Sequence, residues 1–296
     1  MLQPNSAIEI SLEKVRSLGR KIKAARAISE RARLVEGLKR KPELANVMDK
    51  RRGFGKLPSA SIPGISNAIE FAHKVRAERR TPHHKKADYN PTIVDGIRYE
   101  DAPAFYDLAM SDEILQVASD YLGEIPVLVS MKLWCTPPVA GDLKGSQYFH
   151  RDGRQWLLRF AKFVINMDDV TADTGPFTFV PADVSDRVSR SIGTVKQSRV
   201  KDDRFFQVAS PSDPIPLIGT AGTGYAVDSA RCFHYGGRVE RGERLMLQFN
   251  FRRLSDVLEG GRLLRTPAFD ERFGHDPIRQ AAVPNTVQNT SSDVDD

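Results

Sequence analysis

The segment RLMLQFNFRRL, Arg244 to Leu254, alternates between polar and apolar side chains. One face of a strand there would hold Arg244, Met246, Gln248 and Asn250, and the other would hold Leu245, Leu247, Phe249 and Phe251. Because successive strand side chains point to opposite faces, the pattern predicts a strand with one core-packing face and one partly polar face. Unpaired buried polar groups are costly, so the polar face needs an internal partner.

Other segments of the second half also have strand character. They are PVLVSMKLWC (126–135), WLLRFAKFVINM (156–167), GPFTFVP (175–181) and TGYAVDS (223–229). Several short strands separated by turn signals predict a sandwich, barrel or jelly roll rather than a doubly wound sheet. We therefore expect a mainly β fold with flanking helices.

The first part of the chain has helical periodicity instead. Helices are predicted over about 7–40 and 66–79, and a third over 111–121, with Ser111 or Asp112 as its N-cap and Gly123 after its end. The predicted organisation has three parts. A basic helical N-terminal region covers residues 1–90, a β-rich domain covers 91–275, and a C-terminal tail covers 276–296 and is expected to be disordered at its end.

Charge is unevenly spread in this sequence of 296 residues, whose net charge is +6. Residues 11–60 hold fifteen Lys or Arg and five Asp or Glu. Such a segment fits an acidic partner, a membrane surface, nucleic acid or simply a solvated helix face. No apolar run approaches the ~20 residues of a membrane span. The start of the chain lacks a signal-peptide pattern, and the two cysteines have no metal-type spacing, so we expect a cytoplasmic protein.

The stretch SQYFHRDGRQW, Ser146 to Trp156, carries the first candidate site. In extended chain, His150 and Asp152 point the same way and Arg151 points away. Imidazole plus carboxylate suits Fe(II), and a second histidine would complete a triad that leaves positions open on the metal. A His-x-Asp pair is expected by chance in a chain of this composition, so the pair needs support. Downstream, His234 follows an alternating segment, and Arg244 begins the strand ten residues later.

With TADTGPFTFVPADVS between them, these motifs resemble the phytanoyl-CoA dioxygenase family of Fe(II)/2-oxoglutarate oxygenases. The likeness covers roughly residues 111–254 and leaves 1–90 unexplained. ADVS stands where the family has Gly-Ser-His, and Gly236 stands where many members have Ser or Thr. The resemblance implies a double-stranded β-helix, a cupin-like jelly roll, as the core of the β-rich domain.

The resemblance also implies residue roles. His150, Asp152 and His234 match the iron ligands, and Arg244 matches the arginine that holds the distal carboxylate of 2-oxoglutarate. Lys132 occupies a position of cosubstrate contact. The expected activity is a dioxygenase that hydroxylates a small-molecule or acyl-type substrate while O2 and 2-oxoglutarate become succinate and CO2. Asp152 favours hydroxylation over halogenation.

Substrate contacts are expected from Trp156, Gln248, Phe205 and Arg204. The last two lie on the long basic stretch 186–217, which reads either as a lid over an anionic substrate or as an ordinary exposed loop. Two other classes stay open. One is a cupin-like metal enzyme that uses no 2-oxoglutarate. The other is an interaction protein that binds nucleic acid or membrane through its basic helices; nucleic acid is not the partner we expect.

Overall fold

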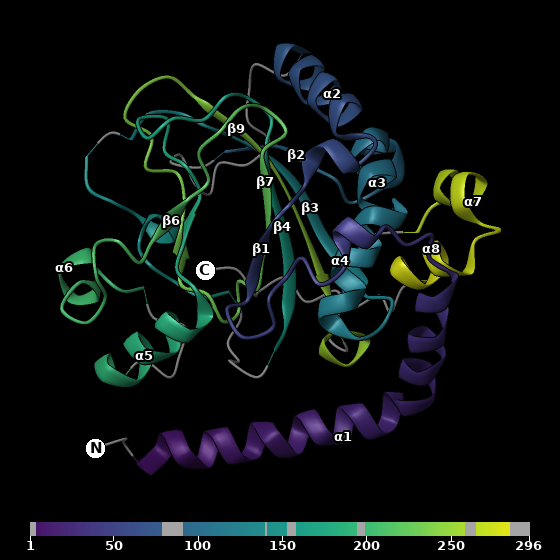
Figure 1. The fold of residues 1–296 in the computed structure, drawn as a ribbon, viewed down its shortest axis with the longest axis horizontal. Coiled ribbons are helices and arrows are strands. Elements are labelled where there is room, and N and C mark those ends of the chain that lie inside the picture. The colour runs from purple at the N-terminus through teal and green to yellow at the C-terminus, as the bar shows by residue number, and fades with distance from the viewer. Residues whose placement is uncertain are drawn as a thin grey trace.

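The fold is taken from a computed structural model, which describes residues 4–78, 91–139, 141–152, 158–193, 199–257 and 265–284. Within these ranges the strands form two sheets (Figure 1). The larger sheet has the order β1-β7-β4-β9-β3-β2 and the smaller has the order β6-β5-β8. The strand pairs are antiparallel in both sheets, so the predicted β-rich architecture is present.

The larger sheet consists of β1 Phe54–Lys56, β2 Thr92–Asp95, β3 Val127–Thr136, β4 Phe160–Asn166, β7 Gly224–Val227 and β9 Arg244–Arg252. The smaller sheet consists of β5 Thr178–Phe179, β6 Ile215–Pro216 and β8 His234–Tyr235. The helices are α1 Pro4–Leu34, α2 Ile65–Glu78, α3 Pro103–Ala109, α4 Asp112–Leu122, α5 Ala182–Ile192, α6 Asp202–Phe205, α7 Pro267–Phe273 and α8 Pro277–Ala282.

Strand β9 lies in the middle of the larger sheet, between β3 and β4. Its odd-numbered side chains, from Leu245 to Phe251, are fully buried in the main core together with residues of α2, α3 and α4. Figure 1 shows these helices on one side of that sheet. The alternation in the sequence therefore identified the core-packing face correctly. Its even-numbered side chains face the other way, toward the smaller sheet.

The space between the two sheets is partly filled by a second apolar cluster. Val164, Val227 and Met246 of the larger sheet pack there with Phe177 and Phe179 from the β5 region. The arrangement of two facing antiparallel sheets is consistent with a jelly roll. The inner face of the larger sheet is thus apolar near these residues and polar elsewhere.

Helix α4 shows how local sequence sets element ends. The Ser111 hydroxyl accepts a hydrogen bond from the backbone N–H of Ile114, which satisfies one of the free donors of the first turn. Gly123 follows the last turn with φ 85°, a left-handed conformation that glycine adopts without a steric penalty. The predicted start and end of this helix are both confirmed.

Helix α1 is tied to the body near its C-terminal end. Arg31 and Glu124 form a buried ion pair at 3.6 Å, and the carbonyl of Arg31 accepts a hydrogen bond from Ile125 N. Farther toward the N-terminus, Val15, Leu18 and Ile22 are 59–69 % exposed. None of the described helices has the length and apolar character needed to cross a bilayer.

Three predicted segments contain elements that the sequence did not predict. The region 1–90 is not purely helical, because β1 forms an edge of the larger sheet and residues between Leu38 and Val75 belong to the main core. The tail 276–296 includes helix α8, whose Ile278 and Ala282 are buried. The stretch 186–217 contains most of α5 and all of α6 rather than one long loop.

Candidate metal centre

The backbone brings His150 and His234 side by side. His150 N donates to His234 O and His234 N donates to His150 O, each at 2.9 Å, so the two residues form a closely bonded antiparallel pair at the end of β8. Asp152 is fixed by its own N–H, which donates to Ser229 O at 2.9 Å. One ligand atom from each of the three side chains lies within 4.8 Å of the others. The predicted pair and its distant histidine thus meet in space.

The hydrogen bonds of the imidazoles orient their free nitrogens. Nδ1 of His150 lies 2.9 Å from Tyr148 O, and Nδ1 of His234 lies 3.0 Å from Cys232 O. Because a carbonyl oxygen only accepts, both Nδ1 atoms carry the hydrogen, which leaves Nε2 of each neutral ring with a free lone pair. These Nε2 atoms lie 4.0 and 3.6 Å from Oδ1 of Asp152. Two imidazole nitrogens and one carboxylate oxygen form a donor set that fits Fe(II).

The surroundings disfavour protonation of two of these side chains, His150 and Asp152. Burial, together with the neighbouring His234, lowers the pKa of His150 to about 3. Burial by itself would raise the pKa of the Asp152 carboxyl, but the nearby ammonium of Lys162 and the imidazole of His234 hold that pKa well below its usual range. A metal ion competes with protons for such atoms, so the low pKa values of His150 and Asp152 favour metal binding.

Arg244 is a buried cation that lacks an acidic partner among the described residues. Its side chain is 1 % exposed, and burial lowers its pKa to about 10. Nη1 donates to Gly175 O at 2.6 Å and Nη2 donates to Thr136 Oγ1 at 3.2 Å, while Nε has no hydrogen-bond partner. An uncompensated buried guanidinium is costly, and it suits the two oxygens of a carboxylate. The site is therefore incomplete without an anionic ligand.

Lys132 and Gln248 are paired across β3 and β9 on the inner face of the larger sheet, where the sequence placed them. The Lys132 ammonium lies 5.4 Å from the centroid of the Trp134 ring. Asn250, the next inward residue on β9, donates to Ser130 Oγ at 2.7 Å. The inner face around the metal ligands is consequently polar.

Two cations of this face were not predicted from the sequence. Lys162, on β4, pairs with Asn250 in register and forms an ion pair with Asp152. Arg252, at the end of β9, lies 4.0 Å from the centroid of the Phe160 ring, and its buried Nε has no hydrogen-bond partner. The signal for Lys162 was available, because a single lysine lies between Phe160 and Val164 on one face of an otherwise apolar strand.

The other candidate substrate contacts lie elsewhere. Phe205 is fully buried and stacks on Phe149, with ring centroids 3.8 Å apart. Arg204 is exposed and donates to Ile192 O. Phe205 thus packs in an apolar cluster, and Arg204 bonds to a carbonyl at the C-terminal end of α5. Trp156 lies outside the described residues.

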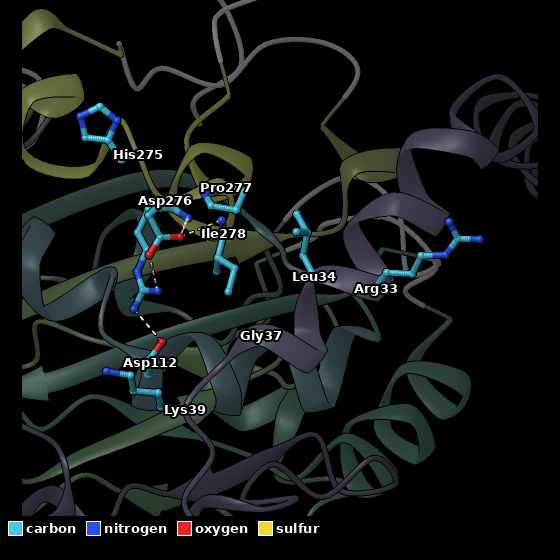
Figure 2. A pocket seen from close by; sticks show the side chains of 10 residues that line it. Arg33, Leu34, Gly37, Lys39, Asp112, His275, Asp276, Pro277 and Ile278 are labelled. Atoms are coloured by element: carbon cyan, nitrogen blue, oxygen red, sulfur yellow. Dashed lines mark hydrogen bonds and ion pairs between the residues drawn. The ribbon is translucent and has the colours of Figure 1, made fainter.

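A separate groove of about 650 Å³ lies where the end of α1 meets α8 (Figure 2). Its lining includes Arg33, Lys39, Asp112, His275 and Arg279. The polar groups at its floor are already paired, since Arg279 donates to Asp112 and to Asp276. It contains none of the three metal-ligand candidates.

No protein-family model and no curated protein matches the chain. Solved structures do match. EctD from S. alaskensis, with 2-oxoglutarate and 5-hydroxyectoine, is 17 % identical with a TM-score of 0.54, over 78 % of this chain and 83 % of that chain. HygX from Streptomyces hygroscopicus, with nickel, 2-oxoglutarate and hygromycin B bound, is 13 % identical with a TM-score of 0.50, over 73 % and 88 %. SnoK, a non-haem α-ketoglutarate-dependent carbocyclase from nogalamycin biosynthesis, is 14 % identical with a TM-score of 0.50, over 74 % and 85 %. The chain shares the fold of 2-oxoglutarate-dependent enzymes.

Proposed function

We propose that this protein is a non-haem Fe(II)/2-oxoglutarate-dependent dioxygenase that hydroxylates a small molecule. The observation that supports the proposal is that one fold contains a set of metal-ligand side chains and, separately, a buried arginine that needs an anionic partner. The His150, Asp152 and His234 ligand atoms converge as a metal triad, and Arg244 is buried without an acid among the described residues. A metal ion completes the first site, and the distal carboxylate of 2-oxoglutarate completes the second.

Each residue then has a defined task. His150 and His234 hold the metal through Nε2, and Asp152 holds it through Oδ1, the oxygen nearest to both rings. Arg244 grips the distal carboxylate of 2-oxoglutarate, while Thr136 and the Gly175 carbonyl keep the guanidinium in place. When bound, Fe(II) with 2-oxoglutarate supplies the oxidising chemistry: one atom of O2 enters succinate, the other enters the hydroxylated substrate, and CO2 leaves.

The family resemblance left open which hydroxyl assists Arg244, and Thr136 is our candidate. Position 236 is glycine where many members have a hydroxyl that assists the arginine. Thr136 lies opposite Arg244 across β3 and β9, and its Oγ1 is already in contact with the guanidinium. We assign Thr136 as the hydroxyl that supports Arg244 in this chain. Lys132 belongs to the same proposed cosubstrate region.

The substrate that we propose carries an anionic group. Arg252 and Lys132 face the interior on either side of the Lys162–Asn250 pair. Neither has a carboxylate oxygen within 4.0 Å in the described ranges, although Asp152 and Asp256 act on the charge of Arg252 from farther away. Gln248, directly opposite Lys132, adds an amide on the same face. Positive charge concentrated around a reaction centre favours anionic ligands. We also propose that the protein belongs to the phytanoyl-CoA dioxygenase family. We propose a cytoplasmic location, because two free thiols suit a reducing compartment.

The deciding experiment measures succinate formation from 2-oxoglutarate in the anaerobically iron-loaded protein, with and without O2, over a panel of small carboxylates, phosphates and neutral analogues. We expect O2-dependent succinate that an anionic compound stimulates. His150→Ala should abolish both iron binding and turnover, and His275→Ala, a histidine of the separate groove, should leave both unchanged. Retention of iron and turnover by His150→Ala would remove the triad assignment.

Arg244→Ala separates this proposal from a cupin-like enzyme that uses no 2-oxoglutarate. Loss of a charge-assisted pair should raise the KM for 2-oxoglutarate at least about tenfold while iron binding persists. Arg272→Ala, which removes an exposed arginine paired with Asp107, is the matched control. An unchanged KM in Arg244→Ala would exclude this arginine from the cosubstrate site.

A further inference from the structure

We infer that Lys162 is a positioning residue that reserves a single oxygen of Asp152 for the metal ion. The inference rests on the proposed metal centre. The two carboxylate oxygens of Asp152 have different surroundings. Oδ2 forms an ion pair with the Lys162 ammonium, whereas Oδ1 faces Nε2 of His234 at 3.6 Å and Nε2 of His150 at 4.0 Å.

The burial of Lys162 shows that this contact is built into the fold. The residue is 4 % exposed on β4, next to the fully buried Ala161 and Phe163. Its in-register neighbours are Val227 on β7 and Asn250 on β9, so neither offers a negative charge. Asp152 is the single acid in ion-pair range of Lys162 within the described part of the chain. A buried ammonium is costly without a charged partner, so each of the two charges holds the other in place.

The division of the two oxygens has a geometric consequence. Because the Lys162 ammonium already holds Oδ2, Oδ1 is the oxygen that Asp152 leaves free for a metal ion, and coordination through both oxygens would have to compete with the ion pair. Coordination through both oxygens would occupy one more position on the ion. A triad with one-oxygen coordination therefore keeps an additional position free, and 2-oxoglutarate and O2 both need positions on the metal. Lys162 secures this arrangement before the metal arrives.

The same contact also affects metal affinity electrostatically. The expected change on replacing Lys162 is opposite in sign to the change expected if Lys162 only supported the fold. The ammonium lies beside a site that takes a divalent cation, and like charges in a buried site repel strongly. It also withdraws electron density from the ligand carboxylate. At a pH at which Asp152 stays ionised in the variant, replacing Lys162 by a neutral side chain should therefore strengthen metal binding. A lysine that only supported the fold would, when replaced, weaken it.

Cobalt(II) is a suitable probe, because its affinity and its visible absorption report the ligand set without turnover. We would titrate Co(II) into the wild type, Lys162→Met and Lys162→Arg, with Lys39→Met, a surface lysine of the separate groove, as the control. Lys162→Met should bind Co(II) about tenfold more tightly, the scale on which residues around the ligands tune metal affinity. The visible absorption of Co(II) bound to Lys162→Met should be weaker than in the wild type, because a higher coordination number weakens Co(II) absorption. Lys162→Arg, which keeps the charge, should resemble the wild type.

The outcomes separate this inference from the proposed function. A wild type that binds no Co(II) overturns both. Wild-type binding with an unchanged or weaker affinity and an unchanged spectrum in Lys162→Met overturns the role of Lys162 alone. If Lys162→Met does not fold, a crystal structure of the cobalt-loaded wild type decides. Asp152 bound through Oδ1 with Oδ2 on Lys162 supports the inference, and coordination through both oxygens overturns it.

Discussion

Gly236 lies against the end of Arg244: a β-carbon at position 236 would lie 3.5 Å from both Nη1 and Nη2. That distance is ordinary van der Waals contact, and the backbone of Gly236 is not among the left-handed glycines. A small side chain therefore fits there. It would stand beside the proposed carboxylate site.

Gly236→Ser should consequently improve cosubstrate binding. Its hydroxyl can donate to the carboxylate that Arg244 holds, and one added hydrogen bond contributes about 1 kcal/mol, or about fivefold in the KM for 2-oxoglutarate. Gly236→Ala is the control that adds the carbon without the hydroxyl. The measurement is the KM from succinate formation. Equal KM values for the Ser and Ala variants would contradict the assignment of this space to the carboxylate.

Thr136→Val tests the hydroxyl that already touches Arg244. Valine keeps the shape and removes Oγ1, which leaves Nη2 of Arg244 without that acceptor. We expect a KM for 2-oxoglutarate that rises about three- to tenfold, with Co(II) affinity unchanged. Thr178→Val, which removes a buried hydroxyl bonded to Pro176 O, is the matched control. A weakened Co(II) affinity in Thr136→Val would indicate a disturbed fold instead.

The free energy of unfolding of the metal-free protein should decrease as the pH falls, because the native state disfavours protonation of His150. The native pKa of about 3 lies below the ordinary value of 6.5, so the unfolded chain binds this proton first as the pH falls. The contribution of this group to stability is therefore lost progressively below pH 6.5, by about 2–3 kcal/mol at pH 4.5. Urea unfolding from pH 7 to 4.5 measures this.

The matched variant for that experiment is His150→Gln, which cannot titrate. Its free energy of unfolding should fall less steeply between pH 6.5 and 4.5 than that of the wild type. Parallel curves for the two proteins would show that another group dominates acid destabilisation.

Phe205 should matter for stability rather than for substrate. It packs with Phe149 and Phe233 in a separate apolar cluster and also contacts the ring of the exposed Phe206. Removing a fully buried phenylalanine typically costs about 3–5 kcal/mol. Phe205→Ala should lower the free energy of unfolding by that order, whereas Arg204→Ala, on the exposed side of α6, should change it by less than about 0.5 kcal/mol. A Phe205→Ala protein of unchanged stability with an altered substrate KM would restore the substrate role that the sequence suggested.

The sequence by itself determined the long strands, the ends of α4 and the chemical character of the candidate site. Alternation in 244–251 identified which face of β9 enters the core, and Ser111 and Gly123 set the ends of α4, because these effects depend on neighbouring residues along the chain. The candidate ligand residues could also be proposed from the sequence, since His, Asp and Arg carry their chemistry wherever they lie.

Only the tertiary structure decided which of those residues meet. His150 and His234 are joined by two backbone hydrogen bonds across 84 positions of the sequence. Asp152 forms an ion pair with Lys162, which lies on β4. Such contacts depend on strand order and register, which the periodicity of a segment does not contain. For the same reason the sequence did not indicate that Phe205 is buried, because its burial depends on α6 packing it against Phe149.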